Sequence, residues 1–243
     1  YFKRQIELQP RIKLKLNHTA SFAELEASAF DEIVVATGVT PRQLDIPGID
    51  HPKVLSYLEV LKERKAVGQR VAIIGAGGIG FDTAELLSHE GESGSINPEK
   101  FYDEWGIDTK YDQVGGLKTP VLEKSSREIY LLQRKAASVG SSLGKTTGWI
   151  HRTGLKHRDV KMIAGASYDR IDDQGLHITV NDKQMVLEVD NVIICAGQES
   201  YTAMFDELKS AGKSVHLIGG AKEAGELDAK RAIRQGAELA AVI

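Results

Sequence analysis

Short apolar runs that end at small residues or glycine recur along this chain, and segments with the spacing of amphipathic helices lie between them. The apolar runs indicate buried strands, so their alternation with helical segments predicts an α/β fold. Buried strands are expected at 31–38, 70–74, 128–133 and 190–197. Helices are expected at 57–65, 81–90 and 226–243, and residues 1–8 have the pattern of the last turns of a helix.

Two further segments have strand patterns of a different kind. Residues 11–17 alternate apolar and polar positions, as a half-buried strand does. Residues 169–187 are punctuated by Asp172-Asp-Gln-Gly175 and by Asn181-Asp182, which are turn-forming sequences. This second segment therefore predicts a meander of three short strands.

A glycine-rich turn follows the apolar run Arg70–Ile74 and has the spacing Gly-x-Gly-x-x-Gly, formed by Gly75, Ala76, Gly77, Gly78, Ile79 and Gly80. In a dinucleotide-binding turn the first glycine allows the tight bend, the second lets a pyrophosphate approach, and the third lets the helix pack on the strand. The N–H groups at the start of the helix attract the anion. Because a strand and a helix flank the turn, we favour a dinucleotide site over a merely structural turn.

The next strand ends in Gln133-Arg134-Lys135. An NAD-binding unit usually carries an acidic residue there, which holds the ribose hydroxyls. The planar fork of arginine suits a 2′-phosphate, so Gln133, Arg134 and Lys135 favour NADP(H). The alternative is that Arg134 and Lys135 are solvated loop charges.

Residues 91–124 separate the glycine turn from the strand at 128–133, where a short connection is usual. The segment is rich in Gly, Ser, Asp and Lys and carries several aromatic residues: Phe101, Tyr102, Trp105 and Tyr111. We interpret it as a surface excursion. The alternative is a lid or docking surface, since aromatic residues in polar loops often mark contact sites.

Residues Asp190–Gly197 repeat the form of Asp31–Gly38: an aspartate, β-branched residues, two small residues and a glycine. Two copies of one strand end flanking a nucleotide-binding unit indicate two related domains, one inserted in the other, although chance similarity would also produce the pair. The expected boundaries are 1–60 and 199–243 for the outer domain and 61–198 for the inner, NADP(H)-binding domain.

The composition excludes several classes of protein. Among 243 residues, 42% are hydrophobic and 27% charged, and the net charge of −3 gives no general attraction to nucleic acid or anionic lipid. We expect neither as a partner, and the absence of a membrane-length apolar run favours the cytoplasm. Cys195 is the only cysteine, so these residues hold no dithiol or cysteine-ligated cluster. The scattered histidines and the absence of an acid/base pair predict no metal site and no catalytic residue.

Together the motifs resemble the two-dinucleotide-binding-domain flavoproteins, in which an NAD(P)H domain is inserted between the halves of an FAD domain. Thr37-Gly38 and Ala196-Gly197 match the domain crossovers of that family, and Gly219-Gly220 matches its C-terminal flavin-contacting motif. Longer strings are similar to the C-terminal part of the bacterial NADPH-dependent 2,4-dienoyl-CoA reductases: Gln133–Lys135, Gly144–Arg152, Cys195–Gln198 and Leu227–Gly236.

The resemblance implies a Rossmann-like NAD(P)H-binding domain inserted in an incomplete FAD-binding α/β domain. It also implies a longer enzyme, with an N-terminal TIM barrel that holds FMN and acyl-CoA and with a 4Fe-4S cluster outside this chain. NADPH would then supply electrons, through FAD, to remove a double bond from dienoyl-CoA in fatty-acid β-oxidation. The chain starts at Tyr1, on a helical segment, and we expect a fragment that is incomplete for catalysis on its own.

The chain departs from the family pattern in its FAD half. Residues 1–74 contain no second Gly-x-Gly-x-x-Gly, and Gly220 stands where many relatives have an aspartate for the ribityl chain. We therefore expect FAD to be held weakly by this chain alone. Two other functions stay open: the NADPH-binding part of another flavoprotein oxidoreductase, such as an amine dehydrogenase or a flavin reductase, and a non-catalytic dinucleotide-binding module.

Overall fold

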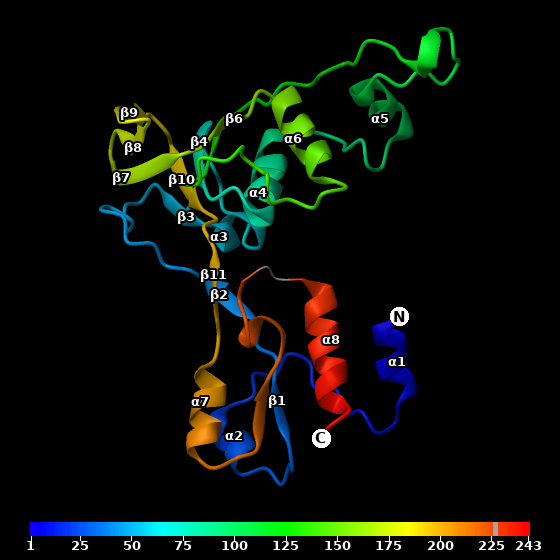
Figure 1. Cartoon of the computed structure of the whole chain (residues 1–243), viewed down its shortest axis with the longest axis vertical. Coiled ribbons are helices and arrows are strands. Elements are labelled where there is room, and N and C mark those ends of the chain that lie inside the picture. The colour runs from blue at the N-terminus through cyan, green and yellow to red at the C-terminus, as the bar shows by residue number, and fades with distance from the viewer. Residues whose placement is uncertain (226–227) are drawn as a thin grey trace. The chain divides into compact units, whose positions relative to one another are not determined.

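The computed structural model describes residues 1–225 and 228–243, which form two compact units (Figure 1). The outer unit combines residues 1–40 with 198–243, and the inner unit is 41–197. The inner unit starts earlier than the expected residue 61, because β3 (Val54–Ser56) pairs with a strand of the inner sheet.

The inner unit is built on a parallel sheet of five strands in the order β3-β10-β4-β5-β6. The four strands after β3 have these bounds: β4 (Arg70–Ile74), β5 (Glu128–Leu132), β6 (Lys161–Ile163) and β10 (Asn191–Ile194). The chain runs outward from β4 through β5 to β6 and then returns to place β10 on the other side of β4. This reversal is the switch point of a Rossmann-like fold, and the α/β fold predicted from the apolar runs is confirmed.

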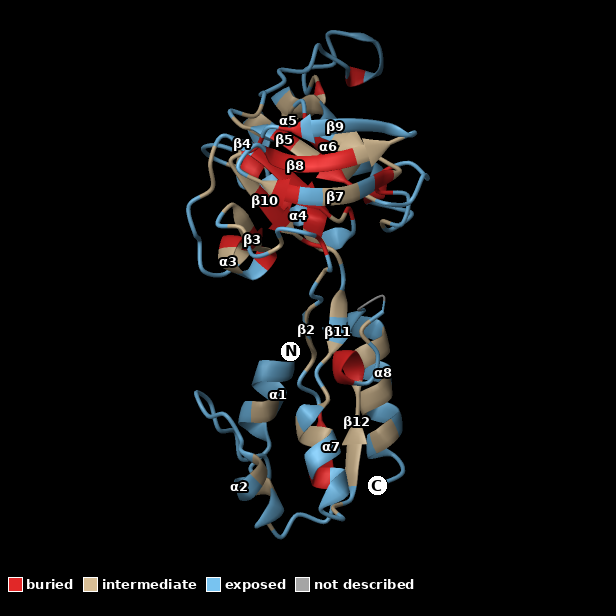
Figure 2. Ribbon diagram, turned by 90° about the vertical axis from the view of Figure 1, so that its left-hand side faces the viewer, coloured by how far each residue is buried: buried red, intermediate tan, exposed pale blue. Residues whose placement is uncertain are grey.

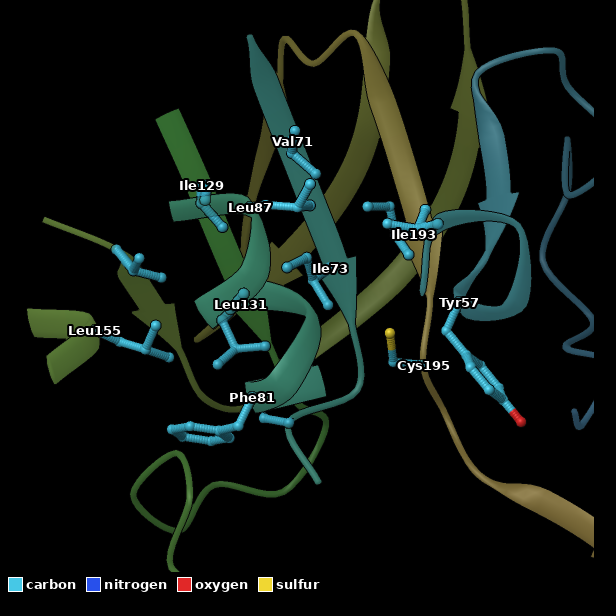
Figure 3. Close-up of a cluster of buried hydrophobic side chains, with 14 of the residues drawn as sticks. Tyr57, Val71, Ile73, Phe81, Leu87, Ile129, Leu131, Leu155, Ile193 and Cys195 are labelled. Atoms are coloured by element: carbon cyan, nitrogen blue, oxygen red, sulfur yellow. The ribbon is translucent and has the colours of Figure 1, made fainter. Parts of the chain in front are cut away.

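Helices cover one face of this sheet. They are α3 (Tyr57–Leu61), α4 (Gly78–Ser88) and α6 (Gly148–His157). Figure 3 shows their side chains against the sheet, with Phe81 of α4 and Leu155 of α6 packed in the cluster that contains Ile73. Side chains alternate across a strand, so Val71 and Ile73 face the helices while Ala72 and Ile74 face the other way.

An antiparallel meander covers the opposite face, as predicted for residues 169–187. Its strands are β7 (Ala166–Asp172), β8 (Gly175–Val180) and β9 (Lys183–Leu187). Leu176 and Ile178 of β8 are fully buried with Ile74 of the sheet. Asn181 and Asp182 both have positive φ, 48° and 61°, which is the backbone of a tight hairpin turn.

The segment 91–124 connects α4 to β5 and contains α5 (Pro98–Trp105) and the short 3₁₀ turn η1 (Val114–Gly116). Asn97 caps α5 by accepting a hydrogen bond from the N–H of Lys100, and Gly106 ends the helix in the left-handed region at φ 62°. These are strong local start and stop signals for a helix. The insertion therefore has secondary structure of its own.

The outer unit has a smaller core. Its strands β1 (Ile33–Val35) and β12 (Val215–Leu217) form a two-stranded parallel sheet, and β2 (Val39–Pro41) pairs with β11 (Gln198–Ser200). Its helices are α1 (Phe2–Leu8), α2 (Phe22–Glu26), α7 (Ala203–Ser210) and α8 (Ala229–Ala240), with the 3₁₀ turn η2 (Gly219–Ala221). Figure 2 shows that much less of the outer unit than of the inner unit is buried. Among the residues that the structure describes, the buried hydrophobic cluster of the outer unit consists of Ile33, Val35 and Leu208.

Some sequence predictions differ from the structure. Residues 11–17 are not a strand: Leu14 and Leu16 are 59% and 73% exposed, and no neighbouring strand pairs with this described segment. The helix expected at 57–65 ends at Leu61, and the one expected at 81–90 is Gly78–Ser88. The last helix begins at Ala229; residues 226–227, where it was expected to start, lie outside the described residues. Within residues 1–225 and 228–243, every helix is too short or too polar to span a bilayer.

Candidate functional site

The candidate site lies where three strands of the inner sheet end together. Ile74 of β4 is in register with Leu132 of β5 and with Ile194 of β10. Two hydrogen bonds fix the exits of these strands: the N–H of Gly75 donates to the carbonyl of Leu132 (2.9 Å), and that of Cys195 donates to the carbonyl of Ile74 (2.8 Å). Ligands of open α/β sheets bind at this edge beside the switch point.

The structure brings three groups of predicted residues to this edge. They are the glycine turn Gly75–Gly80, the strand end Gln133–Lys135 and the crossover Ala196–Gly197.

Two glycines of the turn are required by packing. Gly75 has a φ of 110°, and a Cβ atom there would lie 2.6 Å from the carbonyl oxygen of Cys195. At Gly80 a Cβ atom would lie 1.8 Å from the carbonyl oxygen of Gly75. Neither position has room for a side chain, so the fold alone explains these two glycines.

Gly77 is different, because the fold does not require a glycine there. Its φ of −84° suits any residue, and a Cβ atom would have no neighbour within 4 Å. Gly77 is the N-cap of α4, and no side chain caps that helix. The turn thus presents open space in front of the N–H groups of a helix start, which is the arrangement that holds a phosphate group. The residues present therefore fit a dinucleotide pyrophosphate.

The side chain of Gln133 organises the loop that follows β5. Its amide donates to the carbonyl oxygens of Lys135 (2.9 Å) and of Ala137. The N–H of Gly165 also donates to the Lys135 carbonyl, at 3.1 Å. Gln133 therefore holds the loop, while the side chains of Arg134 and Lys135 are exposed.

Tyr168 marks the side of the site where β5 meets the meander. Burial of its ring raises the pKa of Tyr168 to about 12, and the positive charge of nearby Arg134 acts in the opposite direction. The Tyr168 hydroxyl therefore stays protonated at neutral pH. The Arg134 guanidinium, exposed at this edge, is available to an anionic group.

Cys195 directly follows β10, next to the glycine turn, and is buried. Burial raises the pKa of the thiol to about 12, so it stays protonated and is not a nucleophile at neutral pH. Its Sγ atom lies 3.6 Å from the Oγ1 atom of Thr83, which also donates to the carbonyl of Ile79 at 2.7 Å. Thr83 is a fully buried polar residue of α4 that sequence reasoning did not place in the site; its position on the apolar side of that helix was the available signal.

Ala196 and Gly197 lead the chain out of the inner unit. The Cα atom of Ala196 lies 2.9 Å from the Cβ position of Gly75, so Ala196 forms part of the floor of the turn. The carbonyl oxygen of Gly197 accepts a hydrogen bond from the N–H of Arg42 at 3.2 Å. This bond joins the entry and the exit of the inner unit.

The remaining predicted residues belong to the outer unit, at the ends of β1 and β12: Thr37, Gly38, Gly219 and Gly220. Each of the four has one polar group engaged within that unit, among them the Gly38 carbonyl, which accepts from the N–H of Tyr201 at 3.2 Å. The Thr37 hydroxyl donates to the carbonyl of Tyr201 (2.7 Å), and the N–H of Gly219 donates to the Gln235 side chain (2.7 Å). The carbonyl of Gly220 accepts from the hydroxyl of Ser200 at 2.8 Å.

The described part of the chain contains no group of three or more His, Cys, Asp or Glu residues placed to bind a metal ion.

Two curated proteins are similar to the chain over most of its length. A cinnamate reductase of Clostridium sporogenes is 27% identical over 214 residues, which cover 87% of this chain and 27% of that protein. A metal reductase of Desulforamulus reducens is 27% identical over 199 residues, which cover 81% of this chain and 28% of that protein. The chain thus spans about a quarter of the length of these relatives.

Solved structures share the fold. A complex of 2-naphthoyl-CoA reductase with 2-naphthoyl-CoA has a TM-score of 0.77 at 24% identity, covering 100% of this chain and 31% of that one. The 6-hydroxypseudooxynicotine amine oxidase of Pseudomonas geniculata has a TM-score of 0.72 at 16% identity, covering 97% and 32%. At these identities the likeness concerns the fold alone.

The family match extends over both units. Residues 4–221 match the pyridine nucleotide-disulphide oxidoreductase family, from α1 to η2. Since Cys195 is the only cysteine, the chain itself has no dithiol with which to exchange a disulphide. The glycine turn, the switch point and the extent of the match agree, and the chain belongs to the pyridine nucleotide-disulphide oxidoreductase family.

Proposed function

We propose that this chain is the NADPH-binding, electron-input part of a flavin-dependent 2,4-dienoyl-CoA reductase that acts in fatty-acid β-oxidation. Membership of the family implies binding of a pyridine nucleotide and of FAD. The observation that carries the nucleotide part of the proposal is Gly77, a glycine that the fold does not need, in front of an uncapped helix start. A phosphate group explains both features.

Each residue of the inner site has a role in this proposal. The backbone N–H groups of the turn hold the pyrophosphate, with the positive end of the α4 dipole behind them. Arg134 makes charge-assisted hydrogen bonds to the 2′-phosphate, and Lys135 raises the local positive potential. Gln133 positions this pair through its bonds to the loop carbonyls.

The outer unit would hold part of the FAD, through Thr37, Gly38, Gly219 and Gly220. Because Gly220 provides no carboxylate, and because the Thr37 hydroxyl, the Gly219 N–H and the Gly220 carbonyl already have partners, we expect this chain alone to hold FAD weakly. When bound, the nicotinamide supplies a hydride that the flavin accepts. We assign FMN, the 4Fe-4S cluster and the acyl-CoA site to an N-terminal TIM barrel of a longer cytoplasmic protein.

The dienoyl-CoA assignment is supported by the sequence strings at 133–135, 144–152 and 195–198 and by similarity to a cinnamate reductase. The family contains other chemistries, so the substrate needs its own test. In the full-length protein, NADPH oxidation should depend on a 2,4-dienoyl-CoA thioester. Oxidation driven by an amine and not by the thioester would contradict this assignment without affecting the nucleotide site.

The nucleotide function can be tested on this chain. We expect titration to show tighter binding of NADPH than of NADH. We also expect an artificial electron-accepting dye to be reduced by NADPH only when FAD is added. NADPH binding with no dye reduction at saturating FAD would identify a binding module, and a preference for NADH would contradict the assignment of Arg134.

A further inference from the structure

A cavity of about 260 Å³ lies between the insertion and the helix layer of the inner unit. We call it the α5–α6 cavity. Its walls come from Phe101 and Trp105 of α5, Leu122 on the return of the insertion, and Ile150, Gly154 and Leu155 of α6. Nothing in the nucleotide function described above uses this space.

Gly154 of α6 lines the α5–α6 cavity, although neither the helix nor the packing favours a glycine there. It lies inside α6, where glycine destabilises a helix by about 1 kcal/mol relative to alanine. Packing does not require it: a Cβ atom there would meet no heavy atom within 4 Å. A ligand in the cavity would explain this glycine, because a side chain at position 154 would occupy the space that the ligand needs.

The charged groups of the cavity wall are already paired. Glu85 lies 3.4 Å from His151, and Glu104 lies 3.9 Å from Arg158. Glu123 pairs with Lys100 at 3.0 Å. Glu104 and Glu123 thus face cations and Glu85 faces an imidazole nitrogen, so no carboxylate of the wall is left without a polar partner for a charged ligand to satisfy.

Aromatic rings dominate the wall beside α5. The Trp105 ring lies 6.3 Å from that of Phe101 and 6.1 Å from the imidazole of His157, measured between centroids. Such rings favour an aromatic ligand, which can pack edge to face or offset against them. Polar groups of the lining, among them the paired hydroxyls of Ser93 and Ser95, offer hydrogen bonds to a ligand N–H or hydroxyl.

The volume sets the size of the ligand. An apolar cavity of roughly 150 Å³ accepts benzene. At 260 Å³, the α5–α6 cavity has room for a larger molecule of about two fused rings.

The wall contributed by the insertion is preformed. Asn97 and Gly106 cap α5 at its two ends, and the Glu104–Arg158 pair joins α5 to the end of α6. The side chains of that pair are only 20% and 15% exposed. A cavity with fixed walls loses less entropy on binding than a mobile loop does.

From these observations we propose that the α5–α6 cavity is a binding site for a neutral aromatic molecule of about two fused rings. This site is separate from the nucleotide turn, and the inference does not depend on the identity of the dinucleotide or on dienoyl-CoA chemistry.

The first test uses 5-fluoroindole as the probe and ¹⁹F line broadening of the probe as the readout, on the whole 243-residue chain. We expect saturable, sub-millimolar binding to the unmodified chain. Gly154→Leu fills the cavity and should weaken binding at least tenfold. Lys156→Leu, an exposed position on the same helix that does not line the cavity, is the matched control and should leave binding unchanged.

The second test guards against a misfolded leucine variant. Gly154→Ala should raise the melting temperature by about 2–4 °C, because alanine favours the helix and its Cβ atom meets open space. The same variant should weaken probe binding. Absence of saturable binding to the unmodified chain, or equal binding by the Gly154→Leu and Lys156→Leu variants, would overturn the proposal.

Discussion

In each of the two units, a pair of parallel strands is followed by small residues and glycine: β4 and β10 in the inner unit, β1 and β12 in the outer unit. The two sheet edges differ in the hydrogen bonds that their polar groups make. In the inner unit, the glycine turn leads into a helix start that no side chain caps, beside the open space at Gly77. In the outer unit, Thr37, Gly219 and Gly220 already make hydrogen bonds to Tyr201, Gln235 and Ser200.

The strands that carry the repeated motif, β10 in the inner unit and β1 in the outer unit, also differ in burial, and β10 is the more buried. β10 lies between β3 and β4, and its residues Val192 and Ile193 have no exposed surface. β1 has one strand neighbour, β12, and its Val34 is 41% exposed. Similar strand-end sequences therefore occur at one edge with an uncapped helix start and open space at Gly77, and at another where Thr37, Gly219 and Gly220 each have a polar group bonded within the unit. A glycine motif becomes informative about ligands only when its packing is known.

The largest expected effect separates the two kinds of glycine within the inner turn. Gly77→Val should weaken NADPH binding at least about 100-fold, or about 2.8 kcal/mol, because the side chain occupies the space proposed for the pyrophosphate. The fold should persist, since a Cβ atom at this position meets no neighbour. Titration and a melting curve measure the two properties.

Gly80→Ala is the counterpart of that variant. Its Cβ atom would lie 1.8 Å from the Gly75 carbonyl, so we expect the inner unit to lose about 1–3 kcal/mol of stability.

Wild-type NADPH affinity in the Gly77→Val chain would show that the turn does not hold the nucleotide.

The next effect concerns the exposed cation at the end of β5. Arg134→Ala should weaken NADPH binding by about 1.5–3 kcal/mol, roughly tenfold to a hundredfold, and should hardly change NADH binding. The difference should shrink at high salt. Arg170→Ala, which removes an exposed arginine paired with Asp172 on β7, is the control. Equal losses for the two nucleotides would mean that Arg134 does not contact the 2′-phosphate.

A smaller effect is expected at the outer edge. Gln235→Ala removes the acceptor of the Gly219 N–H and should lower the stability of the outer unit by about 1 kcal/mol. Hydrogen exchange should become faster in η2 and β12, and NADPH affinity should stay within twofold of the unmodified chain. A large loss of NADPH binding in this variant would break the distinction between the two edges.

The smallest effect concerns Asp190, at the start of the repeated strand motif. The backbone N–H and guanidinium of Arg70 hold the pKa of Asp190 below its usual 3.8. A lowered pKa in the folded state means that the carboxylate stabilises the fold above about pH 4 and that this contribution disappears as the pH falls below 3.8.

Asp190→Asn should therefore lower the free energy of unfolding by about 0.5–1 kcal/mol at pH 7. The difference between the two chains should narrow below pH 4, as acid unfolding curves would measure. A difference that stays constant down to pH 3 would show that ionisation of Asp190 is not its cause.

Local sequence patterns predicted much of the inner unit. The apolar runs at 70–74 and 128–133 are strands because they are buried on both faces, and the turn at Asn181-Asp182 has residues that tolerate a positive φ. The alternating segment 11–17 shows the limit of this reasoning. Its pattern fits a strand, but a strand also needs a neighbour to pair with, and that depends on distant residues.

The same limit applies to the candidate site. The spacing of Gly75, Gly77 and Gly80 identifies the turn. The spacing does not show that packing requires a glycine at the first and third positions and not at Gly77, because that depends on how close a Cβ atom would come to the surrounding backbone. Gln133 was singled out as a missing acid, and its bonds to the following loop could not be inferred from its position. The Glu104–Arg158 pair joins segments far apart in the sequence and left no local signal.

The hydrogen bond between Arg42 and Gly197 has a consequence for the order of events during synthesis. It closes the inner unit at its own ends, so that unit can fold once residue 197 has left the ribosome. The outer sheet must wait longer, because β1 pairs with β12 and contacts such as Glu32–Ser214 join residues 182 positions apart. A chain that long is costly to close unless its interior is already compact. We therefore expect the inner unit to form first and the emerged N-terminal strand β1 to stay unpaired until synthesis is nearly complete.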